Sequence, residues 1–266
     1  MPFTDKEPNT TLPSHTTPPS GADIKTTPSS SSFPDLPSTL VVTRAPENSR
    51  WARSSTHWIS PPSSPPVLTS YHHIGLSSTG SIAIHAGADT RTPAIASTKS
   101  ENALRERSTL TIAAHDGLAA ISERLDVHKS FGPEQWSFVL AVRPAEEGGT
   151  GVEKFEWRST TGPETTTLWG TGTSTRGWKL VRMNGPQRWD SSAKGGEGRT
   201  AGWTRDGKEI VAVWVDDEFK MFPAIVAKFG ALGSGVAGAQ GDLGKEWRVM
   251  ALLSALRMRQ IRKNRG

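Results

Sequence analysis

The chain has 266 residues, of which 34% are hydrophobic and 21% charged, and its formal net charge is +5. It contains no Cys, which excludes disulfides, Cys-ligated zinc, iron–sulfur clusters and a Cys nucleophile. No apolar run approaches the roughly 20 residues of a membrane-spanning helix, and the first residues lack the apolar stretch of a secretory signal. We therefore expect an intracellular protein, cytoplasmic or nuclear.

Residues 1–70 are rich in proline and small polar residues. Pro, Ser and Thr occupy 38 of these 70 positions, and apolar residues are scattered among them. Such a segment buries too little apolar surface to offset the entropy of its chain. We predict a disordered N-terminal arm over residues 1–70 and one folded domain over residues 71–266, which is a usual size for a single domain.

Short segments that alternate apolar and polar residues dominate the folded part, and this pattern is typical of all-β proteins. Asp116-Gly117 and Asp206-Gly207 favour the tight turns of hairpins. Longer links are expected only at residues 87–107 and 190–198. The segments predicted as strands are Tyr71–Leu76, Ser81–His85, Thr109–Ile112, Leu118–Leu125, Trp136–Val142, Val152–Arg158, Gly177–Met183, Arg199–Thr204, Glu209–Val215 and Lys220–Leu232.

The pattern changes near the C-terminus, where Val249–Leu256 contains one polar residue in eight. We predict a helix over about residues 242–262, with Asp242 as its cap and Glu246 in its first turn. A helix that is apolar all round must be buried on all sides. A closed antiparallel sheet can surround such a helix. The predicted fold is therefore all-β with one buried C-terminal helix, a closed antiparallel β-barrel around a central hydrophobic helix. Its expected core includes Trp178, Trp214, Trp247, Leu252, Leu253 and Leu256.

The order of strands and final helix is carried by Phe155–Arg158, Gly177–Arg182, Asp206–Trp214 and Trp247–Met258. In this order the chain resembles the tubby C-terminal-like superfamily, which includes the LURP-one-related proteins and the phospholipid scramblases. The likeness covers roughly residues 71–262. It implies a barrel with the helix along its axis. Tubby itself binds phosphoinositides through basic side chains, but no motif transfers those positions to this chain.

Positive charge is concentrated at the C-terminus, because residues 244–266 carry seven basic residues and one acidic residue. Cations at the end of a helix complement its dipole, and this explanation requires no ligand. The functional alternative is a contact with a phosphoinositide headgroup, an acidic membrane or nucleic acid. The residues that would make this contact are Arg257, Arg259, Arg262, Lys263 and Arg265.

Signals for catalysis, metals and cofactors are weak. His72, His73, His85, His115 and His128 lack the spacing of a metal site, and we expect them to be solvated at strand ends. The stretch from Gly233 to Gly238 matches G-x-G-x-x-G. It neither opens a helix directly nor precedes an acidic residue about 20 positions on, so we predict a loop rather than a dinucleotide site.

The sequence therefore favours a non-enzymatic binding or scaffold module with no cofactor, no metal and no catalytic residue. We expect a monomer that touches anionic membrane lipid and does not bind nucleic acid, and no protein partner can be named. The alternative is a hydrolase or isomerase with a small pocket at the barrel mouth. That enzyme would use the acidic cluster of Asp216, Asp217 and Glu218, since clustered carboxylates can raise one another's pKa.

Overall fold

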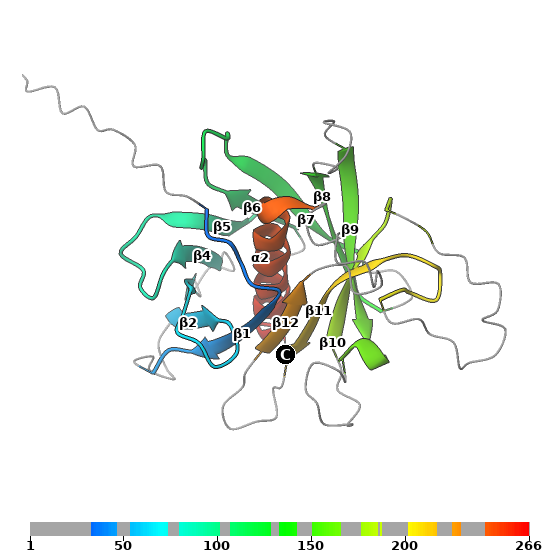
Figure 1. Cartoon of the computed structure of the whole chain (residues 1–266), viewed down its shortest axis with the longest axis horizontal. Helices are drawn as coiled ribbons and strands as arrows, with labels where there is room; N and C mark the ends of the chain where they lie inside the picture. Colours follow the sequence, from blue (N-terminus) through cyan, green and yellow to red (C-terminus); the bar gives the residue numbers. More distant parts are fainter. Residues whose placement is uncertain are drawn as a thin grey trace, which may run out of the picture. The chain divides into compact units, whose positions relative to one another are not determined.

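The computed structural model of the chain (Figure 1) describes residues 33–46, 54–73, 80–101, 107–128, 133–142, 151–165, 177–185, 187, 202–216, 225–229 and 243–265. The chain divides into two compact units, Met1–Ser30 and Ser31–Gly266, and all the described residues belong to the second. They form twelve β-strands and one long α-helix.

The strands form one closed sheet. Each strand pairs antiparallel with the next along the chain, and the last pairs with the first. Closure leaves no strand of the barrel with an unpaired edge. The elements are β1 (Thr39–Arg44), β2 (Ser54–Ser60), β3 (Leu68–His73), β4 (Ser81–Ala86), β5 (Ala94–Ser100), β6 (Arg107–Ile112), β7 (Ile121–His128), β8 (Gln135–Val142), β9 (Gly151–Thr160), β10 (Gly177–Arg182), β11 (Ile210–Asp216), β12 (Ile225–Phe229) and α2 (Gly244–Lys263).

Alternation along the strands decides which side chains enter the barrel. On β8, Trp136, Phe138 and Leu140 are at most 1% exposed, whereas the intervening Val139 is 38% exposed. On β9, Phe155 and Trp157 are fully buried. The strands predicted over Trp136–Val142 and Val152–Arg158 are present as β8 and β9.

The helix α2 lies inside the barrel, where it contacts β4, β5, β6 and β8. Figure 1 shows it between β1, β2 and β4 on one side and β8 and β9 on the other. Every residue from Val249 to Met258 is buried, as the lack of a polar face requires. The six side chains predicted for the core are all buried. The predicted fold class is confirmed: a closed antiparallel barrel surrounds one C-terminal hydrophobic helix.

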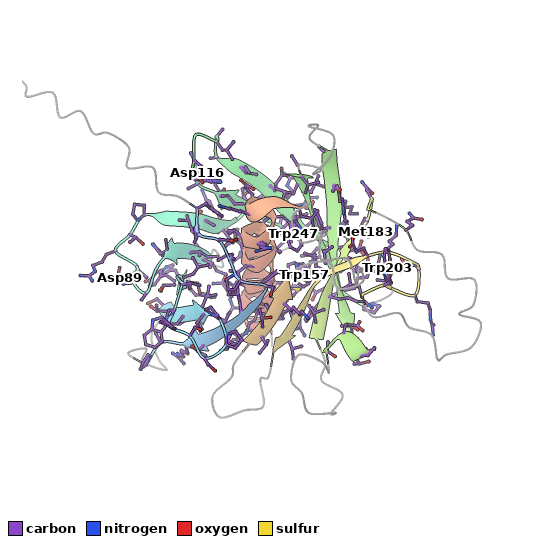
Figure 2. The ribbon with its side chains drawn as sticks, in the orientation of Figure 1. Asp89, Asp116, Trp157, Met183, Trp203 and Trp247 are labelled. Carbon is purple, nitrogen blue, oxygen red and sulfur yellow. The ribbon has the colours of Figure 1, made fainter. Side chains whose placement is uncertain are left out.

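The polar residue in the apolar run of α2, Ser254, is buried and has partners. Its hydroxyl donates to the carbonyl of Ala251 at 2.8 Å and accepts a hydrogen bond from Trp157 Nε1 at 2.9 Å. Figure 2 shows Trp157 in the interior, next to α2. A buried indole N–H usually finds a hydrogen-bond acceptor, and for Trp157 that acceptor is Ser254. Ser254 thus supplies a directional link between the helix and β9.

The helix starts close to its predicted position. Leu243 precedes Gly244 and makes no side-chain capping bond, and Glu246 lies in the first turn. The predicted cap, Asp242, lies outside the described residues.

The predicted boundary at residue 70 is wrong. Strands β1 and β2, and the first residues of β3, come from the segment that the composition assigned to a disordered arm. Leu40, Val42, Ile59 and Leu68 are at most 1% exposed, and Phe33 and Leu36 are also buried. These few apolar residues are sufficient because the neighbouring strands and α2 complete their surroundings. The composition of the segment alone underestimates that burial.

The links and turns also differ from prediction. The predicted link over residues 87–107 contains β5, whose Ile95 and Ala96 are buried. The turn at Asp116-Gly117 is present, with φ of +46° and +78°. Around Gly207 the chain turns as expected. Its described flanks form an isolated bridge between Trp203 and Glu209 and backbone hydrogen bonds such as that from Ile210 N to the carbonyl of Gly202, rather than two full strands.

The burial of α2 predicts the effect of a charge at its centre. Leu253→Asp should prevent folding, because an unpaired buried charge costs several kcal/mol, on the order of the whole stability of a domain. Leu253→Met, which nearly conserves volume, should cost less than about 1.5 kcal/mol. Urea unfolding of both variants is the measurement. A soluble Leu253→Asp protein that unfolds cooperatively would contradict the buried helix.

The contact between Ser254 and Trp157 predicts a smaller and more specific effect. Ser254→Ala leaves the indole N–H of Trp157 buried without its acceptor, which should cost about 1–3 kcal/mol. In a Trp157→Phe background the same change should cost roughly 1 kcal/mol less, because no donor is left unpaired. Equal costs in both backgrounds, measured by urea unfolding, would show that this hydrogen bond contributes nothing.

Candidate functional site

The five basic residues predicted as one C-terminal contact are divided by the structure. Arg257 is buried inside the barrel, Arg259 and Arg262 are partly exposed, and Lys263 and Arg265 are exposed. The guanidinium of Arg262 lies 4.8 Å from the centre of the Trp178 ring. These residues therefore do not form a single solvated tail.

Arg257 is removed from the predicted lipid contact, because only 1% of it is exposed. Its guanidinium donates to Ser108 Oγ at 2.9 Å and to the carbonyl of Gly80 at 2.6 Å, and it also contacts Gln260. These partners lie at the ends of strands β4 and β6 and on the helix itself. Arg257 joins α2 to the barrel wall, and this role is structural.

Arg265 is also engaged. It forms an ion pair with Glu134, just before β8, and its guanidinium lies 5.8 Å from the centre of the Trp136 ring. Such a cation–aromatic contact is worth roughly 0.5–1 kcal/mol at an exposed site. Arg262 and Arg265 thus close this end of the barrel over two tryptophans.

The remaining cations, Arg259 and Lys263, act electrostatically on His57, which lies in the segment predicted to be disordered, and on His72 of β3. Leu40 and Val42 on β1 are buried, and Arg44, the last residue of the strand, continues this alternation but is exposed. In the register of the sheet Arg44 lies opposite His57 on β2, and His57 lies opposite Ser70 on β3. We define the basic cluster as Arg44, His57, His72, Arg259 and Lys263. It combines three neighbouring strands with the last turns of α2.

Two histidines form the inner part of the basic cluster. The rings of His57 and His72 lie 4.4 Å apart, centre to centre. His72 Nε2 is 3.1 Å from Ser70 Oγ, so this ring has a hydrogen-bond partner. Nδ1 of His57 is buried and has no hydrogen-bond partner among the described residues. The basic cluster therefore holds one buried nitrogen for which the described part of the protein supplies no hydrogen-bond partner.

The electrostatic environment keeps both histidines neutral. Burial, followed by the charges of Arg259, Arg44 and Lys263, lowers the pKa of His57 to about 3. Burial, with His57, Arg259, Arg257 and Lys263, holds the pKa of His72 well below its usual range. Among the described residues, the charged groups that act on these two histidines are positive. The basic cluster is thus a site of positive potential, a property that suits an anion.

The predicted solvation of the histidines is wrong for two of them. His72 is 6% exposed and His115 is 8% exposed. His72 follows Leu68 and Ser70 on the inward face of β3, and β3 was predicted to begin three residues too late. His115 is covered from the other end of the barrel, where Phe33 packs against it.

That other end is closed by neutralising contacts. His115 Nε2 lies 3.2 Å from Glu246 in the first turn of α2, and the ring of Phe33 lies 4.2 Å from that of His115. Arg248 donates to the carbonyl of Leu36 at 2.5 Å. The segment Phe33–Leu36 therefore covers the start of the helix, and we assign it a structural role.

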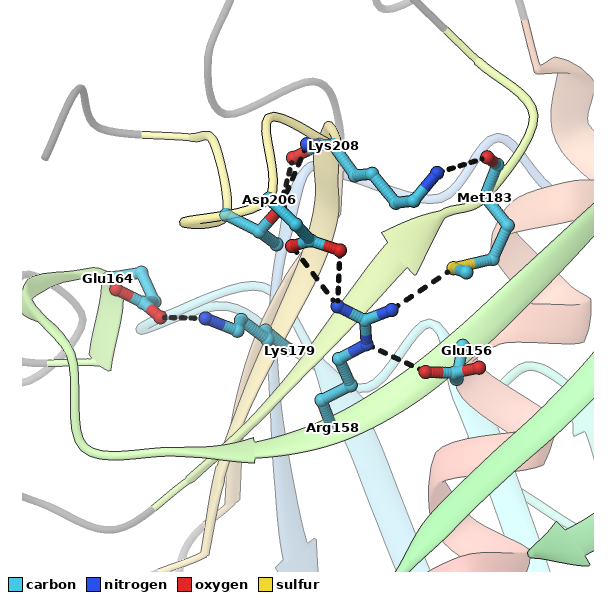
Figure 3. Close-up of polar contacts among 8 residues, drawn as sticks. Glu156, Arg158, Glu164, Lys179, Met183, Asp206 and Lys208 are labelled. Carbon is cyan, nitrogen blue, oxygen red and sulfur yellow. Dashed lines mark hydrogen bonds and ion pairs between the residues drawn. The ribbon is translucent and has the colours of Figure 1, made fainter. Parts of the chain in front are cut away.

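A second polar cluster lies on the outer face of β9 and β10 (Figure 3). Arg158 donates to Glu156 at 2.7 Å and to Asp206 at 3.1 Å, and Lys208 donates to the carbonyl of Met183 at 2.9 Å. Burial alone would raise the pKa of Asp206, but hydrogen bonds from Thr204 and Arg158 outweigh it and lower that pKa. Because opposite charges are paired, this cluster holds the turn at residues 204–208 against the sheet.

The acidic cluster proposed for an enzyme is mostly outside the described residues. Asp216 is the last residue of β11, opposite Ile225, whereas Asp217 and Glu218 are not described. The glycine-rich stretch over residues 233–238 is also outside the described part. Within the described ranges, no three His, Asp or Glu side chains come together as a metal site would require.

No family model matches the chain, and no curated protein matches it in sequence. Among the described residues, no helix combines the length and the apolar character needed to cross a membrane. The basic cluster is therefore interpreted from its own geometry and charge.

The neutral histidines predict that the protein loses stability in mild acid. His57 has a pKa of about 3 in the folded state and 6.5 ordinarily, so between these values the unfolded state binds the proton and acid favours unfolding. From pH 7 to pH 5 His57 should remove about 2 kcal/mol of stability, and His72, whose pKa is also lowered, should add to this loss. Urea midpoints at pH 7, 6 and 5 measure this loss.

The matched variants are His57→Gln and, as a control, His128→Gln. His128 is exposed at the end of β7. The loss of stability between pH 7 and 5 should shrink in His57→Gln and persist in His128→Gln. Parallel pH dependence in all three proteins would contradict the burial of a neutral His57.

Proposed function

We propose that the chain is a non-enzymatic binding module that holds an anionic group at the basic cluster, with the headgroup of an anionic membrane lipid as its ligand. The observation that carries the proposal is the convergence of Arg44, Arg259 and Lys263 on two neutral histidines. An anion placed there would meet three formal positive charges and the buried Nδ1 of His57.

The position of the basic cluster supports a headgroup as the ligand. Lys263 is exposed and Arg259 is partly exposed, so the cations reach from the surface towards the buried His72. A group that projects from a membrane surface could approach from the Lys263 side. Each Lys or Arg near an anionic membrane surface contributes about 1 kcal/mol. Two such residues are therefore sufficient for a measurable, salt-sensitive interaction.

The tubby-like resemblance belongs to the same proposal. The closed barrel and its C-terminal helix agree with the architecture that the resemblance implies. Tubby itself uses basic side chains to bind phosphoinositides. We propose a tubby-like module in which Arg44, Arg259 and Lys263 serve this purpose, whereas Arg257 serves the fold.

Vesicle flotation tests the proposed function. Full-length protein should float with phosphatidylcholine vesicles that contain a few per cent of a phosphoinositide and not with phosphatidylcholine alone. Arg259→Ala combined with Lys263→Ala should weaken this binding by roughly 30-fold, because two contributions of about 1 kcal/mol are lost. Raising the salt concentration should weaken it further.

A control variant with two substitutions removes the same amount of charge elsewhere on the surface. Arg91 and Arg124 have side chains that are 90% and 56% exposed, away from the basic cluster, and changing both to Ala should leave flotation nearly unchanged. Changing Arg262 and Arg265 to Ala should have an intermediate effect. If the Arg259/Lys263 and Arg91/Arg124 variants float equally well, the proposal is wrong.

A further inference from the structure

We infer that anion binding at the basic cluster is coupled to proton uptake by the facing His57 and His72, so that the site binds its ligand more tightly as the pH falls. This inference rests on the proposed function. It assigns to the two histidines a regulatory role that the charge of the site alone would not require.

The first step concerns the buried Nδ1 of His57. In the neutral ring each nitrogen is either a donor or an acceptor, and the described residues offer Nδ1 no partner of either kind. A protonated ring carries N–H groups on both nitrogens, and an anion is a natural acceptor for them. Protonation of His57 would therefore provide a charged N–H donor for the anion, and the anion would provide an acceptor for that N–H. Such a charge-assisted hydrogen bond is stronger than a neutral one.

The second step concerns the charges around the pair. Among the described residues, Arg44 at the end of β1 and Arg259 and Lys263 on α2 act on His57, and His57, Arg257, Arg259 and Lys263 act on His72. Each of these groups disfavours a proton on the ring that it faces. A bound anion offsets part of this positive charge and raises the pKa of both rings. By linkage, protons must then raise the affinity for the anion by the same factor.

The third step decides which ring takes the first proton. The two rings are 4.4 Å apart, so two protonated rings would repel each other. His72 is more deeply buried and its Nε2 already faces Ser70. His57 is partly exposed, and its Nδ1 has no hydrogen-bond partner among the described residues. The first proton therefore goes to His57, and His72 responds second.

The test needs probes whose own charge is constant. Phosphate monoesters change charge near pH 6, so we choose sulfate as the free anion and vesicles with phosphatidylglycerol as the lipid. Affinity for each probe is measured from pH 7.5 to pH 5.5. One coupled proton predicts an increase of up to tenfold per pH unit. Comparing the two probes separates a free anion from a membrane headgroup as the source of the charge.

The variants isolate the histidines. His57→Gln should flatten the dependence of affinity on pH, His72→Gln should reduce it less, and His128→Gln should leave it as in the original chain. NMR titration of the His57 ring in the unaltered protein gives a readout that does not depend on a variant folding. Its pKa should rise when sulfate is added.

The outcomes are distinguishable. A steep increase in affinity at low pH that His57→Gln abolishes, together with a raised His57 pKa, supports the coupling. Binding with the same pH dependence in the original chain and in His57→Gln overturns the coupling and leaves the proposed function standing. Absence of binding to either probe at every pH overturns both.

Discussion

The burial of α2 is the constraint on which the rest of this structure depends. Small barrels of about eight strands fill their interior with the side chains of their own strands. Twelve strands enclose more space than inward side chains can fill, and an empty apolar interior would be costly. The helix fills this space, and the sheet in turn covers a helix that has no polar face. Neither element could keep its form in water without the other.

Apolar contacts alone would leave the helix free to slide or rotate, because hydrophobic attraction has no direction. Three polar side chains on α2 supply that direction. Ser254 is bonded to Trp157 on β9, Arg257 to Ser108 on β6, and Gln260 faces the carbonyls of His73 and Ser81 at 3.4 Å. Together they define one depth and one rotation of the helix. Buried polar networks that are satisfied specify a unique core in this way.

The helix and the first two strands show how much of the fold the sequence could predict. The helix was predictable because eight adjacent residues carry the whole signal. Strands β1 and β2 were missed because each has only a few apolar residues. Their stability depends on pairing, of β1 with the distant β12 and of β2 with β3. The basic cluster was missed with them. Its signal was present in the alternation of Leu40, Val42 and Arg44, but it becomes visible only when that segment is recognised as a strand.

The two ends of α2 show why the basic cluster is more than a complement to the helix dipole. At the N-terminal end His115 meets Glu246 and Phe33, so charge and apolar surface are both matched. At the C-terminal end the dipole favours cations and explains Arg259 and Lys263. It does not explain Arg44, which comes from β1, nor a pair of histidines that burial and the nearby cations keep neutral. Nor does charge balance account for Nδ1 of His57, which is buried without a hydrogen-bond partner among the described residues. An anion that enters this end would use the cations and that nitrogen at once.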